Sequence, residues 1–213
     1  MFSNLSISQL FIVLVCLIVS MALHEAMHGF AAHWLGDDTA EQAGRLTLNP
    51  LKHIDLMTTV LLPLALIIAH KPPFFAAKPV PFNPYRVKYE EFGAAIIGVA
   101  GPLTNLALAI ISGLLFQVWG IHHAGTPAEV LVLFTEVNVA FFLFNMIPFP
   151  PLDGSRLLYA FAPEPLQDIM KRIEATGFIA ILVFFFVIFQ FIATPFSNVE
   201  TKIVAWLLGV TVV

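Results

Sequence analysis

Charged side chains are scarce in this chain of 213 residues. Lys, Arg, Asp and Glu together make up 11% of it, hydrophobic residues make up 59%, and the mean hydropathy is +0.88. A soluble domain carries about 25% charged residues. So few charges cannot coat a water-facing surface, so the composition excludes an ordinary soluble protein and predicts one that lies in a lipid bilayer.

Three further absences narrow the class of protein. Cys16 is the only cysteine, which excludes an internal disulfide and a metal site built from cysteines. No run of basic residues points to nucleic acid as a partner. Residues 1–23 contain no Lys or Arg, so the basic start of a signal peptide is missing. We therefore expect the first hydrophobic stretch to remain as a membrane helix.

Four stretches are long and apolar enough to cross a bilayer, which takes about 20 residues in a helix. They cover residues 7–35, 92–121, 128–148 and 177–194. Residues 56–69 form a shorter stretch, interrupted by Pro63, which is typical of a re-entrant or interfacial segment rather than of a span. The final run, residues 203–213, is expected at the interface or against the bundle. Residues 76–84 are rich in proline and are expected to form an extended loop.

The basic residues favour the re-entrant interpretation. If residues 56–69 return to the side from which they enter, nine of the ten Lys and Arg residues share one side and only Lys202 lies opposite. If the segment crosses, the division is seven against three. Basic loops stay in the cytoplasm, so we expect the N-terminus outside and the nine charges inside. The predicted fold is an all-α polytopic membrane protein with a three-helix core, additional membrane helices, a re-entrant segment and a short extended loop.

The first span contains the pattern His24-Glu25-x-x-His28. Residues four apart share one face of a helix, so the two imidazoles can bind one metal ion. Glu25 points about 100° away from His24 and is placed to act as a base beside a metal-activated water. The same pattern in a soluble helix can be a solvated face. Within an apolar span, ionisable residues are costly and are usually functional.

A catalytic zinc usually has three protein ligands, and Asp153 is the best candidate for the third. It follows the third span after Pro148, Pro150 and Pro151, and Gly154 comes next. Two interpretations stay open from the local sequence: Asp153 is a ligand, or it caps a helix that begins near Gly154. The re-entrant topology favours the ligand, because the first and third spans then run parallel and a turn after the third can reach the depth of His28.

At this point the sequence resembles the site-2 protease family of intramembrane metalloproteases, in its compact form without PDZ or CBS domains. The resemblance rests on His24-Glu25-x-x-His28 and on Asn145-x-x-Pro148-x-Pro150-x-x-Asp153-Gly154. Supporting stretches in the order of the family are residues 44–50, 77–84 and 101–105. Together these motifs cover about residues 15–160.

The resemblance implies one Zn²⁺ per chain, held by His24, His28 and Asp153, with Glu25 as the general base. It also implies that Asn145 lies near the site and helps to hold substrate. For Asn105, contact with substrate and a hydrogen bond between helices both stay open. Members of the family cleave transmembrane helices. A transmembrane protein is thus the expected substrate, and the extended loop can pair with it as an added strand.

We therefore predict a single membrane-embedded protease domain over residues 1–213. Its catalytic core covers about residues 7–160 and its C-terminal membrane segments about residues 163–213. The expected location is the cytoplasmic membrane of a prokaryote, with the active site open towards the cytoplasm. Two alternatives remain: a metal or proton transporter that uses intramembrane His and Asp residues, and an inactive scaffold of the same fold.

Overall fold

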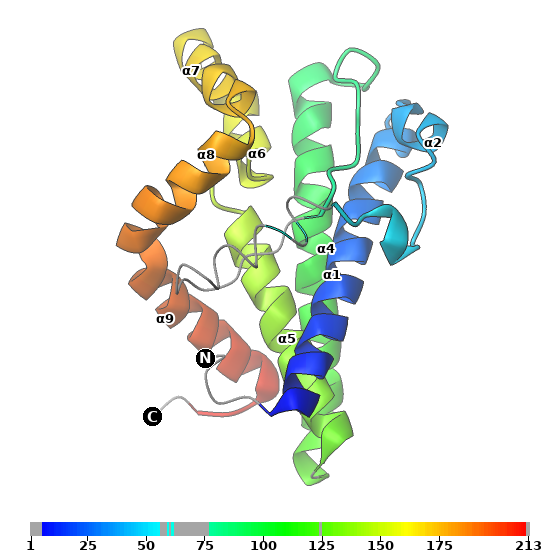
Figure 1. The fold of residues 1–213 in the computed structure, drawn as a ribbon, viewed down its shortest axis with the longest axis vertical. Coiled ribbons are helices and arrows are strands. Elements are labelled where there is room, and N and C mark those ends of the chain that lie inside the picture. The colour runs from blue at the N-terminus through cyan, green and yellow to red at the C-terminus, as the bar shows by residue number, and fades with distance from the viewer. Residues whose placement is uncertain (1–5, 56–58, 60, 62–76, 124, 212–213) are drawn as a thin grey trace.

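The computed structural model describes residues 6–55, 59, 61, 77–123 and 125–211. Four of its helices are long and apolar enough to span a membrane: Ser8–Trp34, Glu90–His122, Thr126–Asn145 and Ile179–Leu208. No β-strand occurs among the described residues. The structure confirms the predicted all-α polytopic membrane fold (Figure 1).

The first span is a single helix, α1 (Ile7–Trp34), which agrees with the predicted range to one residue. A capping box starts it: the Ser6 side chain accepts from the backbone of Gln9, and the Gln9 side chain accepts from the backbone of Ser6. At 1.5 Å per residue the helix is about 42 Å long, which exceeds a hydrocarbon core of about 30 Å. Helix α1 is therefore long enough to cross the apolar layer even when it is tilted.

Helices α4 (Glu90–Val118) and α5 (Thr126–Asn145) complete the core with α1. The backbone N–H of Lys88 donates to the carbonyl of Leu35 at 2.9 Å, so the chain re-enters the bundle at the end where α1 leaves it. Helix α4 is antiparallel to α1, and α5 is parallel to α1 as predicted (Figure 1).

The described elements between α1 and α4 are α2 (Thr39–Gln42), the 3₁₀ turn η2 (Pro50–Lys52) and a segment of residues 77–89 that forms no helix. Residues 77–84 of that segment contain no helix or strand, which confirms the predicted extended loop over its described part. We call residues 77–84 the strap. The predicted re-entrant segment, residues 56–69, lies almost entirely outside the described residues.

After α5 come α6 (Gly154–Phe161), α7 (Glu164–Ala175), α8 (Phe178–Val183), the π-helical turn η5 (Phe184–Ile188) and α9 (Phe189–Leu208). The fourth span was predicted to end at residue 194, and this is wrong. The helix continues through Pro195 to Leu208, because a membrane helix tolerates a proline when neighbours satisfy the freed backbone. The run from residue 203 is therefore the end of this span, and it does pack against the bundle through Val204, Leu207 and Leu208.

Candidate metal centre

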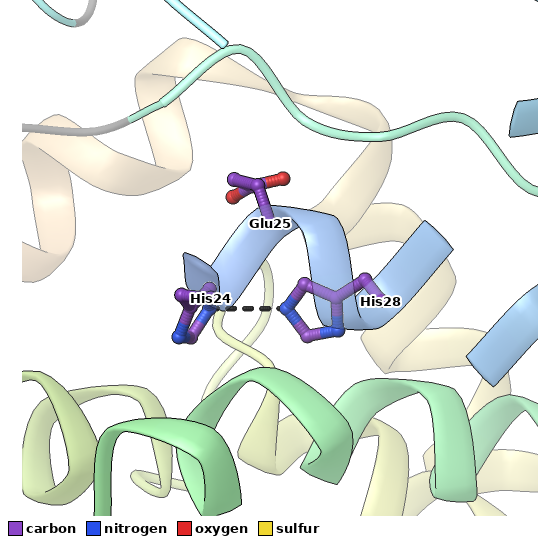
Figure 2. Close-up of side chains that lie close together, drawn as sticks. All are labelled: His24, Glu25 and His28. Atoms are coloured by element: carbon purple, nitrogen blue, oxygen red, sulfur yellow. Dashed lines mark hydrogen bonds between the residues drawn. The ribbon is translucent and has the colours of Figure 1, made fainter. Parts of the chain in front are cut away.

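His24 and His28 of α1 face α4 from the same side of their helix. Their Nε2 atoms are 3.0 Å apart, and both side chains are buried. Figure 2 shows the two rings close together, with the carboxylate of Glu25 projecting in another direction from the same turn of the helix. The helical spacing of four residues thus brings the two imidazoles together as the motif predicts.

Asp153 supplies a third donor atom from a distant part of the chain. One oxygen of its carboxylate, Oδ2, lies 2.9 Å from Nε2 of His24 and 3.3 Å from Nε2 of His28. Asp153 occupies the position before α6, but its side chain makes no capping hydrogen bond. The carboxylate is directed at the histidines, so the capping interpretation is not the one that the structure adopts.

A tight turn makes this approach possible. Helix α5 ends at Asn145, and the chain reverses before α6 begins at Gly154. A side-chain carbon on Gly154 would collide with the carbonyl of Met146, so only glycine fits there. The turn places Asp153 beside α4 and within reach of α1.

The second nitrogen of each imidazole is occupied by a hydrogen bond. Nδ1 of His24 donates to Oδ1 of Asn105 at 2.5 Å, and Nδ1 of His28 donates to the carbonyl of Ile97 at 2.6 Å. With the proton on Nδ1, a neutral imidazole presents a lone pair at Nε2. Two lone pairs and a carboxylate oxygen therefore converge, and such a set of donor atoms is suited to a cation.

Zinc fits this donor set. Tetrahedral ligands at 2.0–2.1 Å from zinc are separated by about 3.3 Å, and the three donor atoms here are 2.9–3.3 Å apart. Gly101 of α4 keeps the space beside them open, because a side-chain carbon there would lie 2.6 Å from Nε2 of His24 and closer still to that of His28. The residues present can hold one zinc ion with an open position.

Glu25 lies near this centre but does not point into it. A carboxylate oxygen of Glu25 and a ligand nitrogen from each histidine all lie within 4.8 Å of one another. Oε2 of Glu25 accepts the backbone N–H of Val80 in the strap at 3.1 Å. Pro79 and Pro81 flank Val80 and have no N–H. Within this tripeptide Val80 is therefore the sole backbone donor, and it holds one oxygen of Glu25.

The strap is tied down along its length. Arg45, which is buried, donates to the carbonyls of Lys78 and Pro79. The N–H of Lys78 donates to the carbonyl of His53 at 2.8 Å. Most backbone groups of residues 78–80 are thus already engaged. We expected an extended substrate to pair with the strap as an added strand. At residues 78–80 few backbone groups are left to hydrogen-bond to such a strand.

Asp37 anchors the far end of the strap. Its carboxylate accepts the backbone N–H of Asn83 at 2.6 Å and two hydrogen bonds from Thr39. Burial raises the pKa of the Asp37 carboxyl, but these hydrogen bonds outweigh burial and hold that pKa below its ordinary value. The strap is therefore fixed both at Glu25 and at the end of α1.

The two asparagines predicted beside the site are placed differently. Asn105 is fully buried and contacts His24, so the structure adopts the hydrogen bond between helices rather than an open substrate surface. Asn145 ends α5, and its side chain donates to the carbonyl of Phe141 in its own helix. It makes no hydrogen bond to the histidines among the described contacts, and its role towards substrate stays a prediction.

Sequence reasoning missed two residues that support the site. Asn138 of α5 and Ser20 of α1 are fully buried, and both hydrogen-bond to Asn105. Ser20 lies one turn before His24, so helical spacing alone could have placed it on the same face as the histidines. No periodicity indicates that Asn138 faces the same point from another helix.

A second group of potential ligands lies at the end of α1. Nδ1 of His33 is 3.1 Å from a carboxylate oxygen of Asp38 and 3.5 Å from one of Glu41. All three side chains are more than a third exposed. Exposed ion pairs of this kind are common on protein surfaces and contribute little, so we assign this group no metal.

Relatives of known sequence share most of this chain. It is 37% identical over 182 residues to "Putative zinc metalloprotease YwhC" of Bacillus subtilis, covering 80% of this chain and 78% of that protein. It is 32% identical over 168 residues to "Putative zinc metalloprotease Rip2" of Mycolicibacterium smegmatis, covering 78% of this chain and 63% of that protein. A protein of the same name from Mycobacterium tuberculosis is 28% identical over 194 residues, covering 89% and 70%. No family model and no solved structure matches.

Proposed function

We propose that the chain, which belongs to the zinc metalloprotease family of YwhC, is an intramembrane protease of the site-2 type. It hydrolyses peptide bonds within or next to the transmembrane helices of other membrane proteins. The observation that carries the proposal is the convergence of His24, His28 and Asp153 between membrane helices, with Glu25 close by.

In this proposal His24, His28 and Asp153 hold one zinc ion. Zinc bound there would supply Lewis-acid activation of a water and of the scissile carbonyl. Glu25 accepts a proton from the attacking water and passes it to the departing amine. The hydrogen bond from Val80 to Oε2 supports this role, because it orients the carboxylate and leaves Oε1 free for the water.

A helical peptide bond is shielded by its own hydrogen bonds, so a substrate helix must unwind before it reaches Glu25. Asn145, at the end of α5 and close in sequence to Asp153, is the residue that we propose to contact the unwound substrate. The positive-inside rule supports a cytoplasmic position for the end of the bundle where α1 ends and α4 begins. We therefore place the N-terminus outside.

The decisive experiment compares the wild type with Glu25→Gln in detergent or in vesicles, on a reporter protein with one transmembrane helix. We expect about one zinc ion in both proteins, and cleavage by the variant reduced by about 10²- to 10⁴-fold, as for loss of a general base. Glutamine keeps the size of the side chain and can still accept from Val80.

Each other outcome contradicts part of the proposal. Cleavage by Glu25→Gln near the wild-type rate would remove Glu25 as the base. A wild type that holds zinc, moves it across vesicles and cleaves nothing would be a transporter. A wild type without zinc would contradict the metal centre itself.

A further inference from the structure

Asn105 joins the metal centre to two neighbouring helices. Its Oδ1 accepts from Nδ1 of His24 at 2.5 Å. Its Nδ2 donates to Oδ1 of Asn138 at 2.8 Å and more weakly to the carbonyl of Ser20 at 3.4 Å. The side chains of Asn105 and Asn138 are both fully buried. If one of these hydrogen bonds is lost, bulk water cannot reach the group that has lost its partner. The orientation of each side chain therefore depends on that of its neighbours.

Asn138 determines which way the amide of Asn105 points. Nδ2 of Asn138 donates to Oγ of Ser20 at 2.9 Å and to the carbonyl of Phe134 at 2.8 Å. Oδ1 of Asn138 is then the group that faces Asn105, and it can only accept. Asn105 must therefore present its NH₂ group to Asn138 and its carbonyl oxygen to His24.

This orientation selects the tautomer of His24. A carbonyl oxygen at Nδ1 stabilises the ring with its proton on Nδ1, which leaves a lone pair at Nε2 facing His28 and Asp153. If the amide of Asn105 were turned around, its NH₂ group would face Nδ1 and favour a proton on Nε2. That proton would occupy the position through which His24 would bind a metal ion.

The two histidines differ in how they are held. His28 is oriented by the backbone carbonyl of Ile97, which substitution of a side chain does not remove. His24 is oriented by the side chain of Asn105, and the side chain of Asn105 is oriented by that of Asn138. Partners that bond the outer nitrogen of a metal-binding histidine orient the ring and raise its basicity.

We propose that Asn105 and Asn138 are positioning residues for the metal centre: Asn138 orients the amide of Asn105, and Asn105 orients His24 as a ligand. This inference rests on the proposed function, because it assumes that His24 binds zinc. The competing explanation is that the two asparagines only tie helices together, which polar side chains in membrane helices also do.

The chain contains a matched control for that explanation. Ser112 and Thr135 form a hydrogen bond of 2.8 Å across the same α4–α5 interface, and both are buried. Ser112 lies two helical turns beyond Asn105, away from the histidines. Ser112→Ala removes a buried interhelical hydrogen bond without touching the metal centre.

The test measures zinc affinity by competition with a chelator, and thermal unfolding, in the zinc-loaded full chain. Asn105→Leu has nearly the same size and cannot accept from His24. We expect its zinc affinity to fall by about 10- to 100-fold, the usual effect of losing such a partner. Ser112→Ala should lower the unfolding temperature and leave zinc affinity within about twofold of the wild type, since no contact joins it to the ligands.

Asn105→Asp tests the direction of the hydrogen bond. In its protonated form the aspartic acid has one oxygen that accepts from His24 and one O–H that donates to Oδ1 of Asn138, so it replaces both hydrogen bonds of Asn105. This variant should keep zinc affinity within a few-fold of the wild type. If Asn105→Leu does not fold, Asn105→Ser replaces it, because a serine can bond the carbonyl of its own helix as Ser112 does. Its shorter side chain does not reach His24.

The outcomes distinguish failure of the proposed function from failure of the positioning role alone. If the wild type binds no zinc, the proposed function fails and this inference fails with it. If the wild type binds zinc and Asn105→Leu binds it equally well, only the positioning role is wrong. The positioning role is also wrong if Ser112→Ala weakens zinc binding as much, or if Asn105→Asp binds zinc as weakly as Asn105→Leu.

Discussion

Polar contacts join α1, α4 and α5, whereas aromatic contacts join the C-terminal helices to α5. In the first region Ser20, Asn105, Asn138, Ser112 and Thr135 are all at most 3% exposed, and each has a hydrogen-bond partner. A helix that rotated or slid here would leave buried polar groups unpaired, which is costly inside a membrane. These contacts therefore fix the rotation and register of the three helices.

Among the described contacts between the C-terminal helices and α5 no polar pair of this kind is present, although Gln117 of α4 donates to the carbonyl of Leu207 of α9 at 2.7 Å. Phe184 and Phe189 pack against Phe144 of α5, with ring centroids 5.6–6.0 Å apart, and Phe149 packs on Phe184 at 5.2 Å. Aromatic packing contributes through contact area and tolerates small shifts. The comparison indicates that the polar contacts of Ser20, Asn105 and Asn138 carry the geometry of the metal centre, while the aromatic region keeps the fourth span attached.

The first way to sharpen this comparison is to remove a ligand. Asp153→Ala should weaken zinc binding by more than the about 10- to 100-fold expected for a residue outside the ligand set. Its unfolding transition without zinc should stay close to that of the wild type, because the carboxylate does not cap α6. Zinc analysis after dialysis measures the effect. Full retention of zinc would exclude Asp153 as a ligand.

The second way is to fill space with a single methyl group in each region. Gly101→Ala places a carbon against Nε2 of both histidines and should abolish zinc binding. Gly113→Ala places one against Leu207 of α9, where overpacking costs about 1–3 kcal/mol. Zinc content and thermal unfolding of both variants distinguish the regions. Equal loss of zinc in the two variants would show that the regions are not separate.

The third way is to remove aromatic packing. Phe184 is 1% exposed, and Phe184→Ala should lower the free energy of unfolding by about 3 kcal/mol through the cavity that it leaves. Zinc affinity should be unchanged at temperatures where the variant is folded. Denaturant unfolding in detergent, followed with zinc titration, provides both numbers. A large fall in zinc affinity of the folded variant would contradict the comparison.

The smallest effect is expected at the strap. Val80→Pro removes the N–H that binds Glu25, and it should lower kcat by up to about 10²-fold through misplacement of the base. Zinc content should not change. Val80→Ala keeps the N–H and serves as the control, with kcat near that of the wild type. Equal activity of the two variants would mean that the hydrogen bond does not orient Glu25.

The sequence predicts contacts between residues that are close in the chain better than contacts between residues that are far apart in it. Helix α1 was predicted to one residue, because its apolar stretch is long and contains no proline, and the meeting of His24 and His28 needs only helical spacing. The end of the fourth span was predicted wrongly, because Pro195 stops a helix in water but not in a membrane.

The proposed third ligand and the residues that support the site show more clearly what the sequence cannot predict. Asp153 could be named from its motif and from the topology, but its local sequence fits a cap as well as a ligand. Only the turn after α5 decides between them. Asn138 could not be assigned, because its partners lie on two other helices and no local pattern reports a contact over 33 residues in sequence.

His24 and Asp153 are 129 residues apart, and this separation has a consequence during synthesis. A chain is made from its N-terminus at about 5–20 residues per second. The two histidines therefore enter the membrane several seconds before Asp153 exists, and they meet it only after α5 has been made and packed. A chain interrupted before residue 153 has two of the three donor atoms. Under the proposed function, a growing chain cannot cleave the membrane helices that surround it during insertion.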